Sequence, residues 1–436
     1  MHGLRVALPW LAVVLVACGS DAAPEGTADP GDSGPGPGPG FDGAPVDAAD
    51  VAADARSPGD TGSPPADGKP PKDGAPPVDD APLPPGSGAR ALAIKLRGKP
   101  SFMIGMGNDL DADHAKDGAY TLGVPIDLHY AYLVGLLGAG GWPDWNAGGS
   151  FVNILADAAV AHGTTPMYTL YSMAAWGDGN VSTVTNDAYM KPYWDGAKLL
   201  FQRVALIGKP AVVHLEPDWW GYAQQHCGGD PTKMPVHVTS LAPDCAGLPD
   251  DIAGMGRCLV KLARTYAPNA AIGFGVSQWA DPSVDKIVAF HLLLGAGDAD
   301  YAAMETLDRD AGCFEAGTDP NCKRGGSFYW DETNVKSPNF HEHLAFAKAI
   351  HDGVGKPLLW WQTPFGAPSD TPGGSAGHYR DNRVHYMFTH VDEFIAAGGA
   401  GIAFGTGAGN QTYVTSDGGE FQAAVTKYYA SPVPIP

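Results

Sequence analysis

Short apolar segments alternate with longer segments of helical spacing from about residue 95 to the end of the chain. The eight apolar segments, which are candidate strands, span 102–106, 126–132, 166–171, 211–215, 271–276, 301–305, 358–362 and 401–405. The segments with helical spacing span 151–162, 193–207, 250–266, 284–294, 340–352, 383–397 and 421–429. Continuous apolar strands that alternate with helices are typical of a parallel sheet covered on both faces.

Eight such units in about 340 residues predict a single (β/α)8 barrel for residues 93–436. A doubly wound open sheet is the alternative, but no glycine-rich phosphate-binding turn follows the first strand. The link between the first two strands has no clear helical pattern. In a barrel the C-terminal ends of all strands meet at one rim, which carries the active site. We therefore look for function in the side chains that follow each strand.

The N-terminal residues 1–18 are predicted to be an export signal. Basic residues precede an apolar run from Val6 to Val16, which is too short to span a bilayer as a helix. The run ends in Leu-Val-Ala followed by Cys18, which resembles a bacterial lipobox. The resemblance implies a lipid on Cys18 and an exported lipoprotein of the outer membrane or cell surface. An ordinary secretory signal with an incidental cysteine is the alternative.

Residues 19–92 are rich in Pro, Gly, Ala and Asp and are predicted to be a disordered acidic linker. Between Gly19 and Ala89 there are thirteen acids and three bases, so this segment holds −10 of the net charge of −21. Such an acidic chain argues against a nucleic acid as partner, because phosphate contacts need Lys and Arg. We expect a monomer that is held at a membrane by the lipid anchor alone.

The fourth candidate strand ends in the densest group of acids and aromatic residues in the chain. The sequence VVHLEPDWWGY there contains Glu216, Asp218, Trp219, Trp220 and Tyr222. Carboxyl groups can transfer protons, and aromatic rings offer apolar faces with a polar edge that suit the C–H faces of a sugar. A salt-bridged strand end above an aromatic core patch is the alternative. The pattern favours a site that binds and cleaves a sugar polymer.

Cleavage of a glycosidic bond requires two carboxyl groups, one of them protonated. Glu216 is predicted to be the general acid, since burial at the end of an apolar strand would raise its pKa. The second carboxyl group is predicted among Glu305, Asp308 and Asp310, which follow the sixth strand. For each of these three, an ion pair with Arg309 is the structural alternative.

Further polar and aromatic residues at the strand ends are predicted to bind substrate. The full set of expected contacts is Asp127, His129, Asp218, Trp219, Trp220, Tyr222, Trp279, Trp360, Trp361 and Gln362. His214 has the same strand parity as Glu216, so we expect it to point into the barrel and to orient Glu216 by a hydrogen bond.

We predict no cofactor and no metal. The spacings CxxC and HExxH do not occur in the chain. The acids Asp109, Asp111 and Asp113 alternate as in a calcium loop, but His114 stands where an EF-hand needs glycine. We interpret this segment as a solvated acidic loop.

The region after the linker resembles the (β/α)8 glycoside hydrolases. Glu216-Pro217-Asp218 is similar to the strand-end EPD of family six cellulases, which implies carboxylate catalysis on a β-glucan-like polysaccharide. The retaining clan of barrel hydrolases carries Glu after strands four and seven, whereas strand seven here ends in Trp361-Gln362-Thr363. A surface lipoprotein that binds glycans without cutting them is therefore the alternative function. A third interpretation is a hydrolase of a non-sugar substrate of the cell envelope.

The cysteines other than Cys18 are typical of an exported protein. Cys313 and Cys322 bracket one polar loop, and Cys227 and Cys245 bracket another, so each pair is predicted to form a disulfide. Cys258 lies in a helical pattern and is interpreted as a small buried hydrophobic residue. The sequence does not fix this connectivity.

Overall fold

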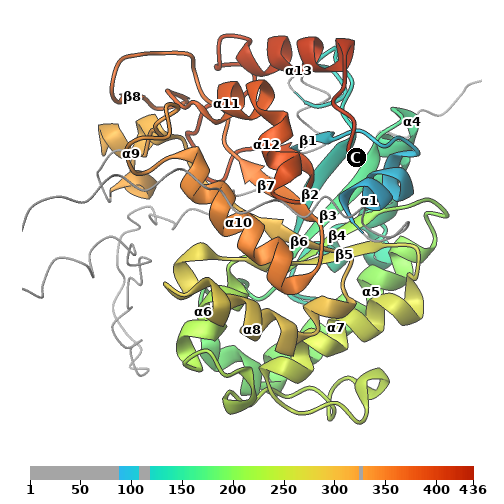
Figure 1. Ribbon diagram of the computed structural model, residues 1–436. Helices are drawn as coiled ribbons and strands as arrows, with labels where there is room; N and C mark the ends of the chain where they lie inside the picture. Colours follow the sequence, from blue (N-terminus) through green and yellow to red (C-terminus); the bar gives the residue numbers. More distant parts are fainter. Residues whose placement is uncertain (1–87, 108–117, 324–327) are drawn as a thin grey trace, which may run out of the picture.

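Eight parallel strands form a closed barrel (Figure 1) in the order β1-β10-β7-β6-β5-β4-β3-β2. The computed structural model describes residues 88–107, 118–323 and 328–436. The barrel strands are β1 (Met103–Gly107), β2 (Leu128–Val134), β3 (Thr165–Tyr171), β4 (Val212–Leu215), β5 (Ala271–Val276), β6 (Tyr301–Met304), β7 (Leu358–Thr363) and β10 (Gly399–Phe404). The predicted (β/α)8 fold is confirmed. Cys18, most of the acidic linker and the acids at 109–113 lie outside the described residues.

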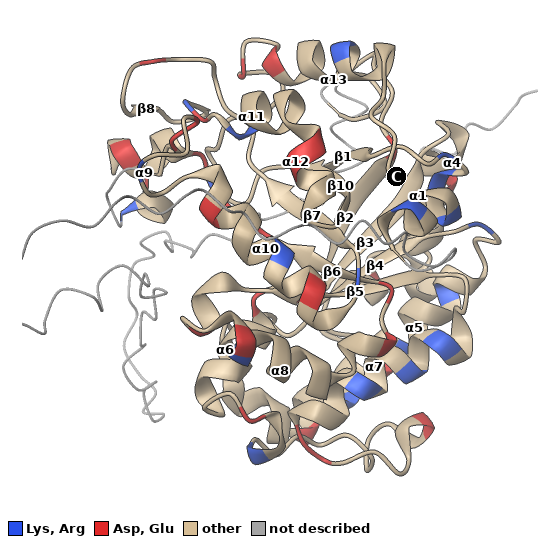
Figure 2. Ribbon diagram, viewed as in Figure 1, with Lys and Arg blue, Asp and Glu red and all other residues tan. Residues whose placement is uncertain are grey.

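Each strand lies within two residues of the segment predicted for it, and β5 matches 271–276. Every residue of β3, β4 and β5 is buried, which is why these strands are apolar without alternation. Figure 2 shows that charged residues lie mainly on the outer helices and loops, whereas the strands carry few of them. The barrel interior and the layer between strands and helices together form the core.

Helices surround the barrel and follow its strands. The described α-helices are α1 (Ala89–Arg97), α3 (Trp142–Trp145), α4 (Phe151–Ala161), α5 (Asp187–Ala205), α6 (Trp219–His226), α7 (Ile252–Tyr266), α8 (Val284–Leu294), α9 (Ala311–Ala316), α10 (Phe340–Val354), α11 (Arg383–Thr389), α12 (Val391–Ala396) and α13 (Glu420–Ala430). A two-stranded hairpin, β8 (Gly374–Ser375) and β9 (His378–Tyr379), lies between β7 and α11. None of the helices in the described ranges is long and apolar enough to cross a membrane.

Two helices differ from their predicted limits for local reasons. The segment predicted to start at residue 193 begins at Asp187, because the Asn186 side chain caps the helix and Pro192 is accommodated near its start. The segment predicted as 383–397 is two helices, since the chain breaks at His390, which has φ −132° and ψ 38°.

Helix α1 covers the end of the barrel at which the strands begin. Lys95 Nζ donates to the carbonyl of Ala270, just before β5, and Arg97 pairs with Asp127, just before β2, at 3.0 Å. The C-terminal segment joins this end, where the Ile435 amide donates to the Pro100 carbonyl at 2.7 Å. Asp127 therefore lies at the base of the barrel, and not at the rim where the sequence placed it.

The two disulfides are Cys313–Cys322 and Cys245–Cys258. The first was predicted, and the second corrects the predicted Cys227–Cys245 pair. Cys258 on α7 approaches Cys245 with a Cα–Cα distance of 5.4 Å, which suits a disulfide. Cys227 is a free, half-buried thiol after α6.

Candidate active site

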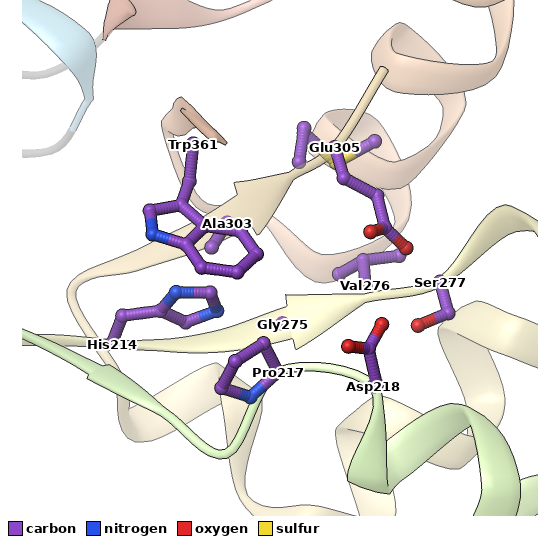
Figure 3. A pocket seen from close by; sticks show the side chains of 10 residues that line it. His214, Pro217, Asp218, Gly275, Val276, Ser277, Ala303, Glu305 and Trp361 are labelled. Atoms are coloured by element: carbon purple, nitrogen blue, oxygen red, sulfur yellow. The ribbon is translucent and has the colours of Figure 1, made fainter. Parts of the chain in front are cut away.

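A pocket of about 180 Å³ lies at the C-terminal ends of β4, β5, β6 and β7. Its lining (Figure 3) consists of His214, Pro217, Asp218, Gly275, Val276, Ser277, Ala303, Met304, Glu305 and Trp361. This is the rim of the barrel where active sites of this fold lie. Much of this volume is open to solvent, and the enclosed part has room for about one water-sized group, so a sugar ring would lie at the mouth of the pocket.

Strained backbone occurs beside this pocket. Glu216, Asp218 and Gln362 have φ angles of 45°, 63° and 52°, in the left-handed region that side chains seldom adopt. Such a conformation costs about 1–3 kcal/mol per residue and tends to gather at functional sites. Two of these residues follow β4 and the third lies at the end of β7, so the strain coincides with the pocket rim.

Asp218 and Glu305 turn their carboxyl groups toward one another across the pocket (Figure 3). Burial and the charge of Glu305 raise the pKa of Asp218 well above its usual range. Burial and the charge of Asp308 raise the pKa of Glu305 to about 7. The Ser277 hydroxyl and the Trp279 indole contact the Glu305 carboxyl and oppose this rise in its pKa. Two close carboxyl groups that repel each other hold one proton between them near neutral pH.

Further acids surround this pair. Asp178, on the loop after β3, and Asp308 both contribute to the raised pKa of Asp218. The hydroxyl of Tyr171 donates to Asp218 Oδ2 at 3.4 Å. Asp308 forms an ion pair with Arg309. The negative charge of this group favours neutral or cationic ligands over anionic ones.

Glu216 does not line the pocket. Its side chain is fully buried, and its Oε2 accepts a hydrogen bond from the Met173 amide at 2.9 Å. Burial raises the pKa of Glu216 to about 8, and contacts with Met173, Ser172 and Tyr193 oppose that rise. The carboxyl group thus faces the loop after β3 and helix α5. This geometry suits a residue that holds the loop in place.

Asp310 is also buried away from the pocket. Its Oδ2 accepts a hydrogen bond from the Thr412 amide, and its own amide donates to Gln411. Burial and the charge of Asp381 raise the pKa of Asp310 well above its usual range, and Arg383, the buried partner of Asp381, opposes that rise. These contacts tie together the loops after β6, β7 and β10.

The predicted aromatic contacts separate into core and site residues. Trp219, Trp220 and Trp360 are at most 2% exposed and belong to the core. The Trp220 indole donates to the Leu215 carbonyl at 2.8 Å, and that of Trp360 donates to His343. Trp361 lines the pocket, whereas Trp279 is half-buried at its edge against Tyr222, with ring centroids 4.8 Å apart.

Two predicted polar contacts lie elsewhere. His129 is buried, and its Nδ1 forms a hydrogen bond of 2.7 Å with the Tyr120 hydroxyl, outside the pocket lining. Gln362 is 6% exposed and lies beside Gly407, where a Cβ would come within 2.5 Å of its Nε2.

Several residues near the site had been assigned no role from the sequence, although Trp176 and Ser277 follow predicted strands. Trp176 and Asp178 are exposed on the loop after β3, and Trp176 is 48% exposed with its ring edge against Tyr189. Ser277 follows β5 and lines the pocket. Their positions directly after strands were the signal that could have identified them. His214 does point into the barrel, as predicted, but it makes no hydrogen bond to Glu216.

Among the residues that the structure describes, no three His, Cys, Asp or Glu side chains are grouped so as to hold a metal ion.

No family model matches the chain, and no curated protein matches it in sequence. Several solved structures are similar to it at low identity. The endoglucanase Cel6 from Mycobacterium tuberculosis is 17% identical, with a TM-score of 0.32, and the match covers 61% of this chain and 73% of the endoglucanase. An endo-β-1,4-mannanase from Thermotoga petrophila is 12% identical over 77% of this chain and 78% of its own, with a TM-score of 0.42.

A sugar epimerase is similar to this chain to about the same degree as these hydrolases. The D-psicose 3-epimerase from Clostridium cellulolyticum H10 is 12% identical, with a TM-score of 0.39, over 76% of this chain and 99% of its own. Glycoside hydrolases that act on glucans and mannans recur among the similar structures. At these identities the likeness concerns the barrel alone.

Proposed function

We propose that this barrel hydrolyses glycosidic bonds in a polysaccharide, with a β-1,4-linked glucan or mannan as the favoured substrate. The observation that supports this most directly is the pair Asp218 and Glu305, which face each other across a pocket at the strand ends. Hydrolysis of a glycosidic bond needs one protonated and one ionised carboxyl group on either side of that bond. A pair that holds a single proton at neutral pH meets this need.

Within the pair, Asp218 is the general acid and Glu305 the base or nucleophile. The Ser277 hydroxyl and the Trp279 indole both stabilise the ionised form of Glu305. Within the described residues, the hydrogen bond that Asp218 accepts is the long one from Tyr171, so we assign the shared proton to Asp218. Asp218 then protonates the glycosidic oxygen as the C–O bond breaks. Glu305 either takes a proton from the attacking water or attacks the anomeric carbon itself. This assignment replaces Glu216 as the acid, because Glu216 lies outside the pocket lining.

Aromatic rings on the loops after β3, β4 and β5 support a polymeric substrate, since Trp176 is exposed and Tyr222 and Trp279 are half-buried. The enclosed part of the pocket accommodates about one water-sized group, and Trp176 and the Trp279–Tyr222 pair lie outside its lining. An exposed indole offers an apolar face on which a further sugar unit can stack. With the lipid anchor predicted at Cys18, the monomeric enzyme would act on polymer outside the cell.

The test is an assay of reducing ends released from β-1,4-glucan and β-1,4-mannan. Asp218→Asn and Glu305→Gln are each expected to lower kcat by about 100-fold or more, since each removes one proton-transfer group. Asp285→Asn, an exposed acid on α8, is the matched control and should keep wild-type turnover. Binding of polymer by the wild type without release of reducing ends would instead favour a glycan-binding lipoprotein. Full activity in either pocket variant would exclude this pair as the catalytic groups.

A further inference from the structure

The end of the pocket away from the two acids is formed by His214 and Trp361 (Figure 3). Both side chains are buried, at 1% and 3% exposed. Their ring centroids are 4.7 Å apart at an angle of 76°, so the edge of one ring meets the face of the other. A Cβ at position 275 would lie 3.0 Å from His214 Nε2, so glycine there leaves space beside the imidazole.

The polar atoms of these two rings have no hydrogen-bond partner within the described part of the chain. This holds for both nitrogens of His214 and for the indole nitrogen of Trp361. Buried polar atoms in proteins are nearly always paired, and one left unpaired costs about 1–3 kcal/mol. Two residues that line the pocket therefore carry three unused hydrogen-bonding atoms. A ligand group that reaches them is held by interactions that the protein alone does not make.

The chemistry of these atoms fits a hydroxyl group. Burial lowers the pKa of His214 to about 3, so the ring is neutral and has one donor and one acceptor. The indole of Trp361 adds a donor. A hydroxyl group both donates and accepts, so it can pair with a neutral imidazole whichever nitrogen carries the proton.

The opposite end of the same pocket restricts the charge of the ligand. Asp218 and Glu305 lie there, and Asp178 and Asp308 are close enough to raise the pKa of Asp218. Arg309 is the cation beside this group and is paired with Asp308. A uronic acid or sulfated sugar would bring a further negative charge next to these carboxyl groups, which is unfavourable.

We propose that His214 and Trp361 form a binding subsite for one hydroxyl group of a neutral sugar, which reaches into the pocket while the sugar ring lies at its mouth beside the acid pair. The subsite makes the protein select neutral glycans and fixes the ring relative to Asp218 and Glu305. This inference rests on the proposed function, because it names the substrate class of that same site.

Calorimetric binding to the full chain carrying Glu305→Gln tests the subsite without turnover. The probes are cellotriose, mannotriose and the monodeoxy derivatives of each, in which one hydroxyl group is missing. One monodeoxy derivative should bind about 10-fold more weakly than its parent, because it leaves the imidazole unpaired. With His214→Phe added, the ratio of the dissociation constant of this derivative to that of its parent should fall to less than about 2-fold. His214→Gln keeps a donor and an acceptor and should retain part of the ratio.

His129→Phe is the matched control, since His129 is equally buried on the neighbouring part of the barrel but outside the pocket. It should leave the ratio between parent and derivative unchanged. Failure of both trisaccharides to bind at millimolar concentration overturns the subsite, as does an unchanged ratio in a folded His214→Phe protein. If the wild type releases reducing ends while that ratio is unchanged, the subsite is wrong and the proposed hydrolysis stands. If the ratio depends on His214 but no reducing ends form, the subsite stands and the proposed hydrolysis is wrong.

Discussion

Replacing Glu216 by glutamine should stabilise the protein, and the gain should grow with pH. The carboxyl group is fully buried, and its pKa is raised from an ordinary 4.5 to about 8. The folded chain therefore holds a proton on Glu216 that the unfolded chain releases above about pH 4.5. Because the native state binds more protons, the free energy of unfolding falls as the pH rises from the unfolded pKa toward the folded one. The glutamine side chain has no such proton and keeps a carbonyl oxygen that can accept from the Met173 amide.

The magnitude follows from the two pKa values. One pKa unit corresponds to about 1.36 kcal/mol, so the full penalty above pH 8 is at most about 5 kcal/mol. Between pH 5 and pH 8 the penalty grows by about 3.5 kcal/mol. We expect the free energy of unfolding of Glu216→Gln to match that of the wild type within about 1 kcal/mol at pH 5 and to exceed it by about 4 kcal/mol at pH 8.

Urea unfolding curves of both proteins at pH 5, 6, 7 and 8 measure this difference. The variant Glu342→Gln, at an exposed glutamate on α10, controls for the general loss of a carboxyl group and should follow the wild type. The reasoning would be refuted if the difference in free energy of unfolding between Glu216→Gln and the wild type were the same at pH 5 and at pH 8. Turnover should persist in Glu216→Gln. Its loss, together with a flat pH difference, would restore Glu216 as the acid predicted from the sequence.

Two other pairs of variants test the structure. Cys258→Ser opens the Cys245–Cys258 disulfide and should lower the free energy of unfolding by about 2–4 kcal/mol. Cys227→Ser should change it by no more than about 0.5 kcal/mol, and a larger loss there in denaturant titrations would contradict the pairing. Trp220→Ala removes a fully buried indole and should cost about 3–5 kcal/mol. Trp279→Ala should keep most of the free energy of unfolding but weaken the retention of the protein on a polysaccharide gel. Equal destabilisation by Trp220→Ala and Trp279→Ala would instead place Trp279 in the core.

The strands were predictable because a barrel strand is covered on both faces. Each strand is therefore a short apolar run between two helical segments. In that setting, a segment such as 271–276 indicates a buried strand of a parallel sheet. Helix limits were less predictable where a single residue decides. Pro192 masked the true start of α5, and the break at His390 depends on backbone angles that the hydrophobic pattern does not encode.

The candidate site was predictable by position but not by orientation. The sequence identified the ends of β4, β6 and β7, and His214, Asp218, Glu305 and Trp361 do line one pocket. The alternation that assigned Glu216 to the interior applies only to extended backbone. Strand β4 ends at Leu215, and Glu216 has a φ angle of 45°, so its side chain leaves the alternation.

The acids after β6 show the same limit. Asp308 and Asp310 are indistinguishable in the local sequence. Asp308 nevertheless lies close enough to Asp218 to raise its pKa, whereas Asp310 is fully buried away from the pocket. The difference comes from residues far along the chain, since Asp310 is held by Thr412 and neighbours the Asp381–Arg383 pair. Such partners are set by the closed barrel and cannot be read from neighbouring residues.

Both ends of the globular region lie at the base of the barrel. Helix α1 covers the strand starts, and the Ile435 amide bonds to the Pro100 carbonyl there, whereas the pocket lies at the strand ends. An attachment made at Gly88, whether to a membrane, a resin or a fused partner, therefore lies at the opposite end of the barrel from the mouth of the pocket. A bulky insoluble substrate could reach the pocket without passing the point of attachment. Immobilised on a bead by its N-terminal segment, the protein should work on solid material as freely as it does in solution.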